Sequence, residues 1–333
     1  MQDFAASPWD SSRVTGVILA AGQGRRMGPL GAYFNKSCPP VCNKPLLATH
    51  FQLLEEIGIR DIVIVIGYKG EAVEKVARSL VPKDAQLRFV VQPEQKGIAD
   101  ALSCARHCVG EWTVLMLGDT HFVATDLRVG LRMLHENPGR TEAVLSVRTV
   151  SDLDLIRNEC TVRLDDRGRL LEIREKPTIP WNDIKPCGVY FFSQRIFEAI
   201  AATMPSTLRN EIEITDAIQT LIRQGSVVEC APTIEWDNNL TRPADLLRSN
   251  LYELKRRGLN EMIGRDTDIH PGASLTDAVI GDEVVIEAPI AIERAMVLER
   301  VRVSGSDHFH DCIVGQDFVI PCSERQSVED IYS

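Results

Sequence analysis

The sequence lacks long hydrophobic runs and any excess of positive charge. No apolar stretch approaches 18 uninterrupted residues, the length that a membrane helix needs, so we expect no membrane span. The first twelve residues have neither the cationic start nor the apolar core of a secretory signal, and we expect residues 1–13 to form a flexible leader. Lysine and arginine number 37 against 47 aspartates and glutamates, a formal net charge of −10, which argues against nucleic acid as a partner.

Cysteine spacing gives little support to either disulfides or metal binding. The nine cysteines are an odd number and are scattered along the chain, which argues against a disulfide framework. The pairs Cys38/Cys42 and Cys104/Cys108 are spaced by four residues and lack the Cys-x-x-Cys spacing of zinc sites. We therefore expect reduced thiols and a cytoplasmic protein, with a metal site at these pairs as the alternative.

Short apolar strands alternate with amphipathic helices in the first half of the chain, which has 333 residues in all. This alternation predicts an α/β fold with a parallel sheet that is covered on both faces. Ligands of such sheets bind beyond the carboxyl ends of the strands. The expected strands are 14–20, 61–66, 87–91 and 112–117, and the expected helices are 46–57, 71–80 and 97–108.

Strands with few helices between them are expected over 143–193. Helices return at 194–203 and 211–223, a strand follows at 227–236, and a last helix covers 243–257. The pattern therefore predicts one catalytic domain over residues 14–258.

A six-residue period characterises the remaining segment, 259–333. Aliphatic residues recur at Ile280, Ile286, Ile292 and Leu298, and the series fades near Ser304. Such a period is typical of a parallel β-helix, so we expect a short domain of this kind, with a plain β-meander as the alternative. A few coils favour a packing or oligomer surface over a catalytic domain.

A glycine-rich turn follows the first expected strand. Gly22 and Gly24 allow backbone amides to crowd around an anion, and Arg25 and Arg26 add positive charge. An ordinary strand-to-helix turn is the alternative, because the turn matches neither a P-loop nor a dinucleotide-binding motif.

Two aspartates at the ends of expected strands are candidate metal ligands. Asp119 follows a buried strand and a glycine, and Asp237 ends another strand. Such carboxylates suit Mg²⁺, which keeps few protein ligands beside waters and phosphate oxygens. A helix N-cap is the alternative for Asp119. Lysines in irregular, proline-flanked segments, at Lys36, Lys44 and Lys176, are candidate fixed cations.

Eight segments, in order over roughly residues 14–250, match the motifs of one known family. They are LAAGQGRRM (19–27), Lys36 with PVCNKP (40–45), Gln92 with GIADA (97–101), Gly118-Asp119, EKP (175–177), CGVY (187–190), EIEITD (211–216) and Trp236-Asp237. In this order and spacing the chain resembles the sugar-phosphate nucleotidylyltransferases, above all the glucose-1-phosphate thymidylyltransferase and uridylyltransferase-like branch.

The resemblance implies a Rossmann-like nucleotidyltransferase core with a mixed, mainly parallel sheet, and a left-handed β-helix in the C-terminal segment. It implies that a nucleoside triphosphate and a sugar 1-phosphate give a nucleotide-sugar and pyrophosphate, with Mg²⁺ as cofactor. The implied catalytic residues are Arg26, Lys36 and Lys176. The implied nucleotide-binding residues are Leu19, Ala21, Gly22, Gly24, Arg25, Gln92, Gly97 and Asp119. The implied sugar-binding residues are Glu175, Lys176, Gly188 and Glu213, and the implied metal ligands are Asp119 and Asp237.

Departures from the family pattern lie mainly on the acceptor side. Asn158-Glu159-Cys160 stands where the family often has an aromatic residue and a glycine, and Cys187 replaces a common threonine or alanine. These differences suggest an unusual acceptor. UTP or dTTP is the expected nucleotide, with CTP left open, and we expect a homo-oligomer, either a dimer or a tetramer. The alternatives are a non-catalytic, regulatory relative and an enzyme that acts on a non-sugar phosphate.

Overall fold

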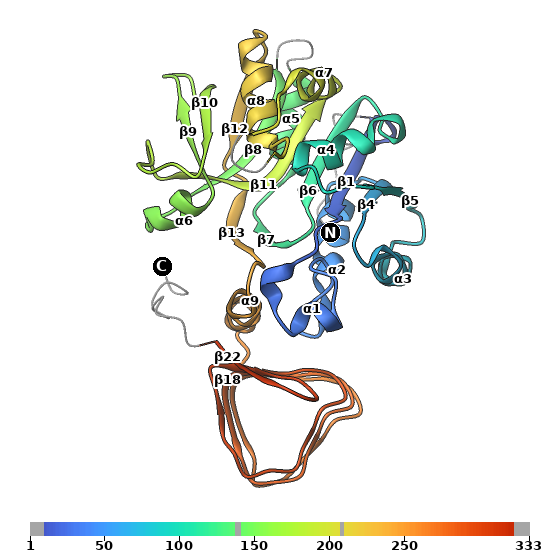
Figure 1. The fold of residues 1–333 in the computed structure, drawn as a ribbon, viewed down its shortest axis with the longest axis vertical. Coiled ribbons are helices and arrows are strands. Elements are labelled where there is room, and N and C mark those ends of the chain that lie inside the picture. The colour runs from blue at the N-terminus through green and yellow to red at the C-terminus, as the bar shows by residue number, and fades with distance from the viewer. Residues whose placement is uncertain (1–9, 137–140, 207–209, 323–333) are drawn as a thin grey trace, which may run out of the picture. The chain divides into compact units, whose positions relative to one another are not determined.

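The computed structural model describes residues 10–136, 141–206 and 210–322, which form two compact units (Figure 1). Of these residues, those up to Gln23 and those within Leu47–Asp237 form one unit, and those within Gly24–Leu46 and from Asn238 onward form the other. The predicted domains, 14–258 and 259–333, stay a prediction, because compactness alone does not define a functional domain. Residues 1–9 of the expected leader lie outside the described residues, and Ser11–Arg13 form a turn of 3-10 helix.

A seven-stranded sheet forms the centre of the first unit, in the order β12-β8-β11-β6-β1-β4-β5. Neighbouring strands are parallel except where β11 pairs with β6 and β8. The expected mixed, mainly parallel sheet of an α/β fold is therefore confirmed. The strands are β1 (Val14–Ala20), β4 (Asp61–Ile66), β5 (Gln86–Val91), β6 (Trp112–Leu117), β8 (Thr141–Thr149), β11 (Ile184–Ser193) and β12 (Val227–Ala231).

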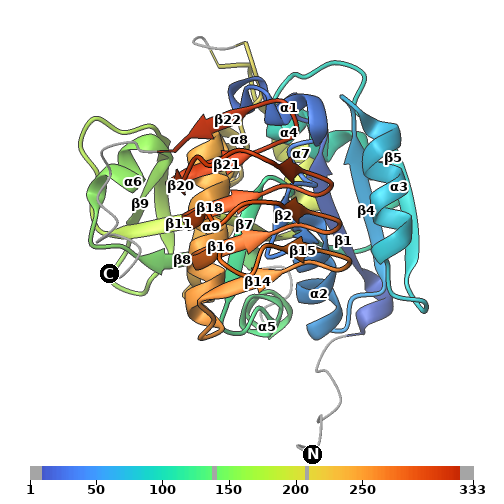
Figure 2. The ribbon, with the colours of Figure 1, turned by 90° about the horizontal axis from the view of Figure 1, so that it is seen from below.

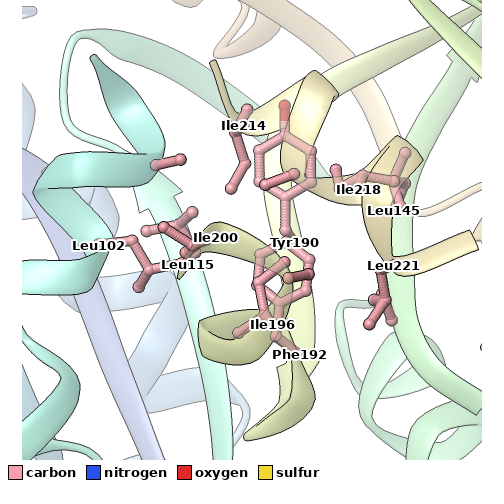
Figure 3. Close-up of a cluster of buried hydrophobic side chains, with 14 of the residues drawn as sticks. Leu102, Leu115, Leu145, Tyr190, Phe192, Ile196, Ile200, Ile214, Ile218 and Leu221 are labelled. Carbon is pink, nitrogen blue, oxygen red and sulfur yellow. The ribbon is translucent and has the colours of Figure 1, made fainter. Parts of the chain in front are cut away.

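Helices cover both faces of this sheet. Successive side chains of a strand point to opposite faces, so an apolar strand packs against helices on both sides. Tyr190 and Phe192 of β11 belong to the core cluster beneath α4, α7 and α8 (Figure 3), whereas Phe191 faces α5. Gly16 of β1 lies against Leu54 of α2. The helices of this unit are α2 (Leu46–Glu56), α3 (Gly70–Leu80), α4 (Ile98–Cys104), α5 (Arg128–Glu136), α6 (Leu153–Asn158), α7 (Arg195–Ala202) and α8 (Ile214–Arg223).

Gly130 of α5 provides a test of this packing. A Cβ at this position would lie 2.2 Å from Cε2 of Phe191, a ring that is fully buried. We expect Gly130→Ala to lower the free energy of unfolding by about 1–3 kcal/mol, because the crowding exceeds the gain in helix propensity. Urea unfolding measures the change. Gly305→Ala is the control, since no atom lies within 4 Å of its added Cβ; an equal loss in both variants would contradict the packing.

The structure corrects three of the expected elements. The strand expected over 227–236 is divided into β12 and β13 (Ile234–Asn239) at Pro232, which has no N–H to donate to a ladder. The helix expected over 97–108 ends at Cys104 and continues as a 3-10 turn, Arg106–Cys108. The helix expected from residue 211 begins at Ile214. Outside the central sheet, β7 (Thr120–Ala124) pairs with β13, and β9 (Cys160–Leu164) and β10 (Leu170–Glu175) form a hairpin.

The second unit combines a helical part with a stack of coils. Its helices are α1 (Leu30–Tyr33) and α9 (Pro243–Arg256), and β2 (Pro40–Val41) pairs with β3 (Lys44–Pro45). Parallel strands of the coils form two sheets. One sheet contains β14 (Glu261–Ile263), β16 (Ser274–Ile280), β18 (Ala291–Val297), β20 (Phe309–His310) and β21 (Cys312–Val314). The other contains β15 (Asp268–Ile269), β17 (Val285–Ile286) and β19 (Arg302–Val303). The last strand, β22 (Val319–Pro321), pairs antiparallel with β21.

Each coil contains seventeen residues, because strand partners such as Ile280 and Val297 are seventeen positions apart. Figure 1 shows the coils end-on, with three sides, and Figure 2 shows them stacked. A β-meander would pair its strands antiparallel, so the parallel registers argue against that alternative. Three steps of six residues would give eighteen, one more than the coil contains. The six-residue series therefore slips by one position per coil, and Val297, not Leu298, lies beside Ile280.

The described residues contain no helix that is both long and apolar enough to cross a membrane. All nine cysteines are free thiols.

Candidate active site

The carboxyl ends of β1 and β6 lie side by side in the first unit. Leu19 is the partner of Leu117 in the sheet, and the next amide, that of Gly118, donates to the Leu19 carbonyl at 2.9 Å. The carbonyl of Ala21 accepts from the side-chain amide of Gln95 at 2.8 Å. Asp119 is partly buried and occupies the turn between β6 and β7. The sheet therefore brings Asp119 to the strand end from which the glycine turn departs.

The glycine turn itself continues into the second unit. Gly24 has a φ of 62°, in the left-handed region that favours glycine, and a Cβ there would lie 3.2 Å from the Cβ of Lys36. Arg25 and Arg26 are exposed in a short 3-10 helix, Arg25–Met27, that buries Met27. Within this unit, the predicted residues Gly24 and Lys36 are thus neighbours.

Gln92 and Gly97, the two residues predicted to bind a base, lie within hydrogen-bonding distance of each other. Gln92 is buried and donates from Nε2 to the Gly97 carbonyl at 3.2 Å and to Asp100 at 2.8 Å. Gly97 has a φ of 109°, and a Cβ there would lie 2.5 Å from the carbonyl oxygen of Ile212. Glycine is therefore required at this position. Its neighbour Ile212 directly precedes Glu213, which is buried at the start of α8.

Lys176 has a strained backbone. Its φ is 43°, and the following residue is Pro177, which disfavours such a conformation in the residue before it. Strain of this kind costs about 1–3 kcal/mol and is often found at functional sites. The amide of Lys176 donates to the carbonyl of Glu159 at 2.6 Å, which fixes the turn after β10. Lys176 is exposed and Glu175 is partly buried.

An irregularity in β11 places Gly188 beside the end of β6. The register of β11 on β8 shifts between Pro186 and Tyr190, and Gly188 has a φ of 73°. A Cβ there would lie 2.9 Å from Cδ1 of Leu117. Bulges of this kind often lie next to active sites, where they redirect the strand.

Asp237 lies within a group of four charged side chains, which we call the Asp237 network: Arg148, Glu159, Lys185 and Asp237. Arg148 donates from Nε to Oδ1 of Asp237 at 2.6 Å, and the Lys185 ammonium donates to Oδ2. Lys185 also pairs with Oε2 of Glu159 at 2.8 Å. The side chains of Lys185 and Asp237 are only 2% and 1% exposed, whereas that of Glu159 is 32% exposed. Two positive and two negative charges balance within the network.

The pKa values of the Asp237 network follow from this pairing. Burial opposes ionisation of Asp237, but Lys185 and Arg148 outweigh it and lower the pKa of this carboxyl. Burial likewise opposes the charge on Lys185, and the carboxylates of Asp237 and Glu159 outweigh it and raise the pKa of this lysine. Burial raises the pKa of Glu159. Asp237 and Lys185 therefore form a charged pair at neutral pH.

Asp119 and Asp237 differ in how well they suit a metal ion. Among the residues described, no group of three or more histidine, cysteine, aspartate or glutamate side chains could hold one. Asp119 suits Mg²⁺, which takes one or two carboxylates beside phosphate oxygens. Each oxygen of Asp237 already accepts from a cation. At about 4 Å and an effective dielectric constant of about 20, a divalent ion and a single positive charge repel by roughly 8 kcal/mol. Asp237 as arranged here does not fit a metal ligand.

Sequence reasoning missed Arg148 and Lys185. The signal that could have revealed them is a charged residue inside an otherwise apolar strand, in AVLSVRTV and IKPCGVYFF. Charges are rarely buried unless they are paired, so each predicts a partner of opposite charge, but not which one.

Comparison with known proteins identifies the family. A family model for nucleotidyl transferases matches residues 15–238. The UTP–glucose-1-phosphate uridylyltransferase AglF of Haloferax volcanii is 32% identical over 229 residues, which cover 69% of this chain and 92% of that protein. The chain belongs to the sugar-phosphate nucleotidyltransferase family.

Two further similarities agree with this membership. The nucleotidyltransferase is 27% identical to a glucose-1-phosphate thymidylyltransferase of Streptomyces griseus, over 90% of this chain and 91% of the relative. Its fold is similar to that of a UDP-glucose pyrophosphorylase crystallised with UDP-glucose, with a TM-score of 0.60, 20% identity, and coverage of 73% of this chain and 99% of the other. The expected enzyme class, a sugar-1-phosphate nucleotidyltransferase, is confirmed.

Buried thiols near the Asp237 network allow a test of this part of the nucleotidyltransferase. Cys160 and Cys187 are buried, and burial raises the pKa of both well above the ordinary value. In the second unit, away from this network in the chain, burial raises the pKa of Cys38 to about 12. At Cys38 this makes the reactive thiolate about a thousandfold scarcer than in a free cysteine.

We therefore expect iodoacetamide at pH 8 to modify Cys38, Cys160 and Cys187 at least a hundredfold more slowly in the native protein than in urea. Peptide mass spectrometry measures the rates. Cys108 and Cys322, which are partly exposed, are the internal comparison. Equal rates at all five positions would contradict the burial described above.

Proposed function

We propose that the protein transfers a nucleotidyl group from UTP or dTTP to a sugar 1-phosphate. In this reaction an oxygen of the sugar phosphate attacks the α-phosphorus in line, the bond to the β-phosphate breaks, and pyrophosphate leaves. One observation carries the proposal: the carboxyl ends of β1 and β6 lie side by side, which brings Asp119 to the start of the glycine turn. In an α/β sheet this edge is where ligands bind.

The proposed roles follow the charges of the substrates. Negative charge grows on the phosphoryl oxygens, so fixed cations stabilise the transition state better than a general base does. Arg26 and Lys36 neutralise the triphosphate and the departing pyrophosphate, and Lys176 binds the sugar phosphate. The backbone of the nucleotide site comprises Leu19, Ala21, Gly22, Gly24 and Arg25.

Specificity is assigned to residues around the two substrates. Gln92 and Gly97, which are joined by a hydrogen bond, bind the edge of a pyrimidine. Glu175, Gly188 and Glu213 bind the sugar. Asp119 would hold Mg²⁺, which when bound supplies positive charge between the phosphates. The two cationic partners of Asp237, the predicted second metal ligand, favour another role for this residue.

We propose a cytoplasmic homo-oligomer, a dimer or a tetramer, in which the coils form a left-handed β-helix that provides subunit contacts. The three-sided coils with parallel registers support this assignment. Light scattering on the full chain, with mass measured after chromatography, determines the oligomeric state.

A pyrophosphate-release assay tests the proposed reaction. Purified protein with Mg²⁺ is combined with ATP, GTP, CTP, UTP or dTTP and with either a panel of hexose and aminohexose 1-phosphates or phosphocholine. We expect release with one nucleotide–sugar pair, and none with Asp119→Ala. Nucleotide binding without release on any pair would support a regulatory relative, and release only with phosphocholine would support a non-sugar acceptor.

A further inference from the structure

Two cations of the Asp237 network face each other across neighbouring strands. Lys185 of β11 is the direct partner of Arg148 of β8 in the antiparallel register. Like charges directly opposite each other in a sheet repel, so this pair is stable only with an anion between its members. Asp237 supplies that anion, with one oxygen for each cation.

We propose that the ammonium group of Lys185 occupies the place beside Asp237 that the family resemblance assigns to a metal ion, so that Asp237 binds this lysine and not a divalent cation. This inference rests on the proposed function. It makes Asp119 the protein ligand of the divalent ion and Lys185 a positioning residue of the reaction.

The place of Lys185 supports this assignment. The side chain is buried in a central strand, 2% exposed, and its ammonium contacts two carboxylates, those of Asp237 and Glu159. A buried ammonium with two such partners is held in place, because leaving them would expose two unpaired carboxylates. The lysine is therefore a permanent cation, in contrast to an ion that exchanges with solvent.

Glu159 connects the Asp237 network to the proposed acceptor site. Its carboxylate pairs with Lys185, and its carbonyl accepts the backbone N–H of Lys176, the proposed ligand of the sugar phosphate. The strained conformation of Lys176 thus depends on a residue that Lys185 holds.

The test measures thermal unfolding with and without 1 mM Mn²⁺, in wild type, Lys185→Met and the double variant Lys185→Met/Asp237→Asn. We expect Lys185→Met to unmask Asp237 as a metal ligand, so that Mn²⁺ raises its Tm by roughly 3–5 °C more than it raises that of wild type. The double variant, which lacks the carboxylate, should lose this additional shift. Lys185→Arg, which keeps the cation, should respond as wild type does.

Two results would overturn the inference. One is a Lys185→Met variant that gains no additional shift, because the ammonium would then not occupy a cation position. The other is a Mn²⁺ shift in wild type that Asp237→Asn removes, because Asp237 would then bind metal in the native protein. The second comparison needs no Lys185 variant and decides the question if Lys185→Met fails to fold.

Kinetics separate positioning from a merely structural role. With the substrate pair found in the pyrophosphate assay, Lys185→Met should raise the KM for the sugar phosphate about tenfold and leave the KM for the nucleotide within twofold. Equal changes in both would contradict positioning of the acceptor site. Because the Tm comparisons need no turnover, they test the inference even if no substrate pair reacts, an outcome that would count against the proposed function alone.

Discussion

Lys185→Met is expected to lower the free energy of unfolding by about 3–5 kcal/mol, since it leaves Asp237 buried with a single cationic partner. Urea unfolding in metal-free buffer measures the loss. Lys83→Met, which removes an exposed lysine of the same unit, should change stability by no more than about 0.5 kcal/mol. A loss at Lys185 below about 1 kcal/mol would contradict a tightly paired network.

The loss of unfolding free energy in Lys185→Met should also depend on pH in a defined direction. The pKa of Asp237 is lowered on folding, so its contribution is present above its ordinary value and disappears as pH falls through the folded value. The pKa of Lys185 is raised, so its contribution is present below its ordinary value and disappears as pH rises through the folded value. The difference between wild type and Lys185→Met should therefore be constant between about pH 5 and 10 and shrink below about pH 4.

Asp119→Asn is expected to lower kcat/KM by about a thousandfold, or about 4 kcal/mol of transition-state stabilisation. The amide keeps the size of the carboxylate but removes the charge that would hold Mg²⁺, so Tm should change by less than 2 °C. The measurement is the pyrophosphate assay on the reactive substrate pair. Asp126→Asn is the matched control, because Asp126 lies beyond the other end of β7 and pairs on the surface with Arg128. If Asp119→Asn kept activity within threefold of wild type, Asp119 would not be part of the active site.

Much of the fold could be predicted because its strands are continuous apolar runs. Buried parallel strands such as 61–66 are hydrophobic on both faces, and this composition is local information. The pairing of β7 with β13 is not local, because the two strands are about a hundred residues apart. The bulge at Gly188 likewise depends on its contact with Leu117, which no pattern in the sequence specifies.

The candidate site could be predicted only where a motif is contiguous. Gln92 and Gly97 are five positions apart, and the structure joins them by a hydrogen bond. Arg148 and Lys185 come from neighbouring strands of the central sheet, whereas Asp237 comes from β13, which pairs with β7, so only the folded chain brings the three together. A carboxylate at a strand end resembles a metal ligand in the sequence, whether or not cations of the same chain already surround it.

The seventeen-residue coil limits how this chain can change in length. Gly264, Gly281 and Gly315 occupy equivalent places one or more coils apart, and a Cβ at Gly264 would lie 2.4 Å from the backbone carbon of Gly281. Arg265 and Asp282, and likewise Arg294 and Asp311, pair across one coil. Inserting or deleting a whole coil keeps every such pair in phase, whereas any other number of added residues has to loop out at a turn to keep the later partners in register. The segment can therefore lengthen or shorten by whole coils of seventeen residues without any chain having to loop out.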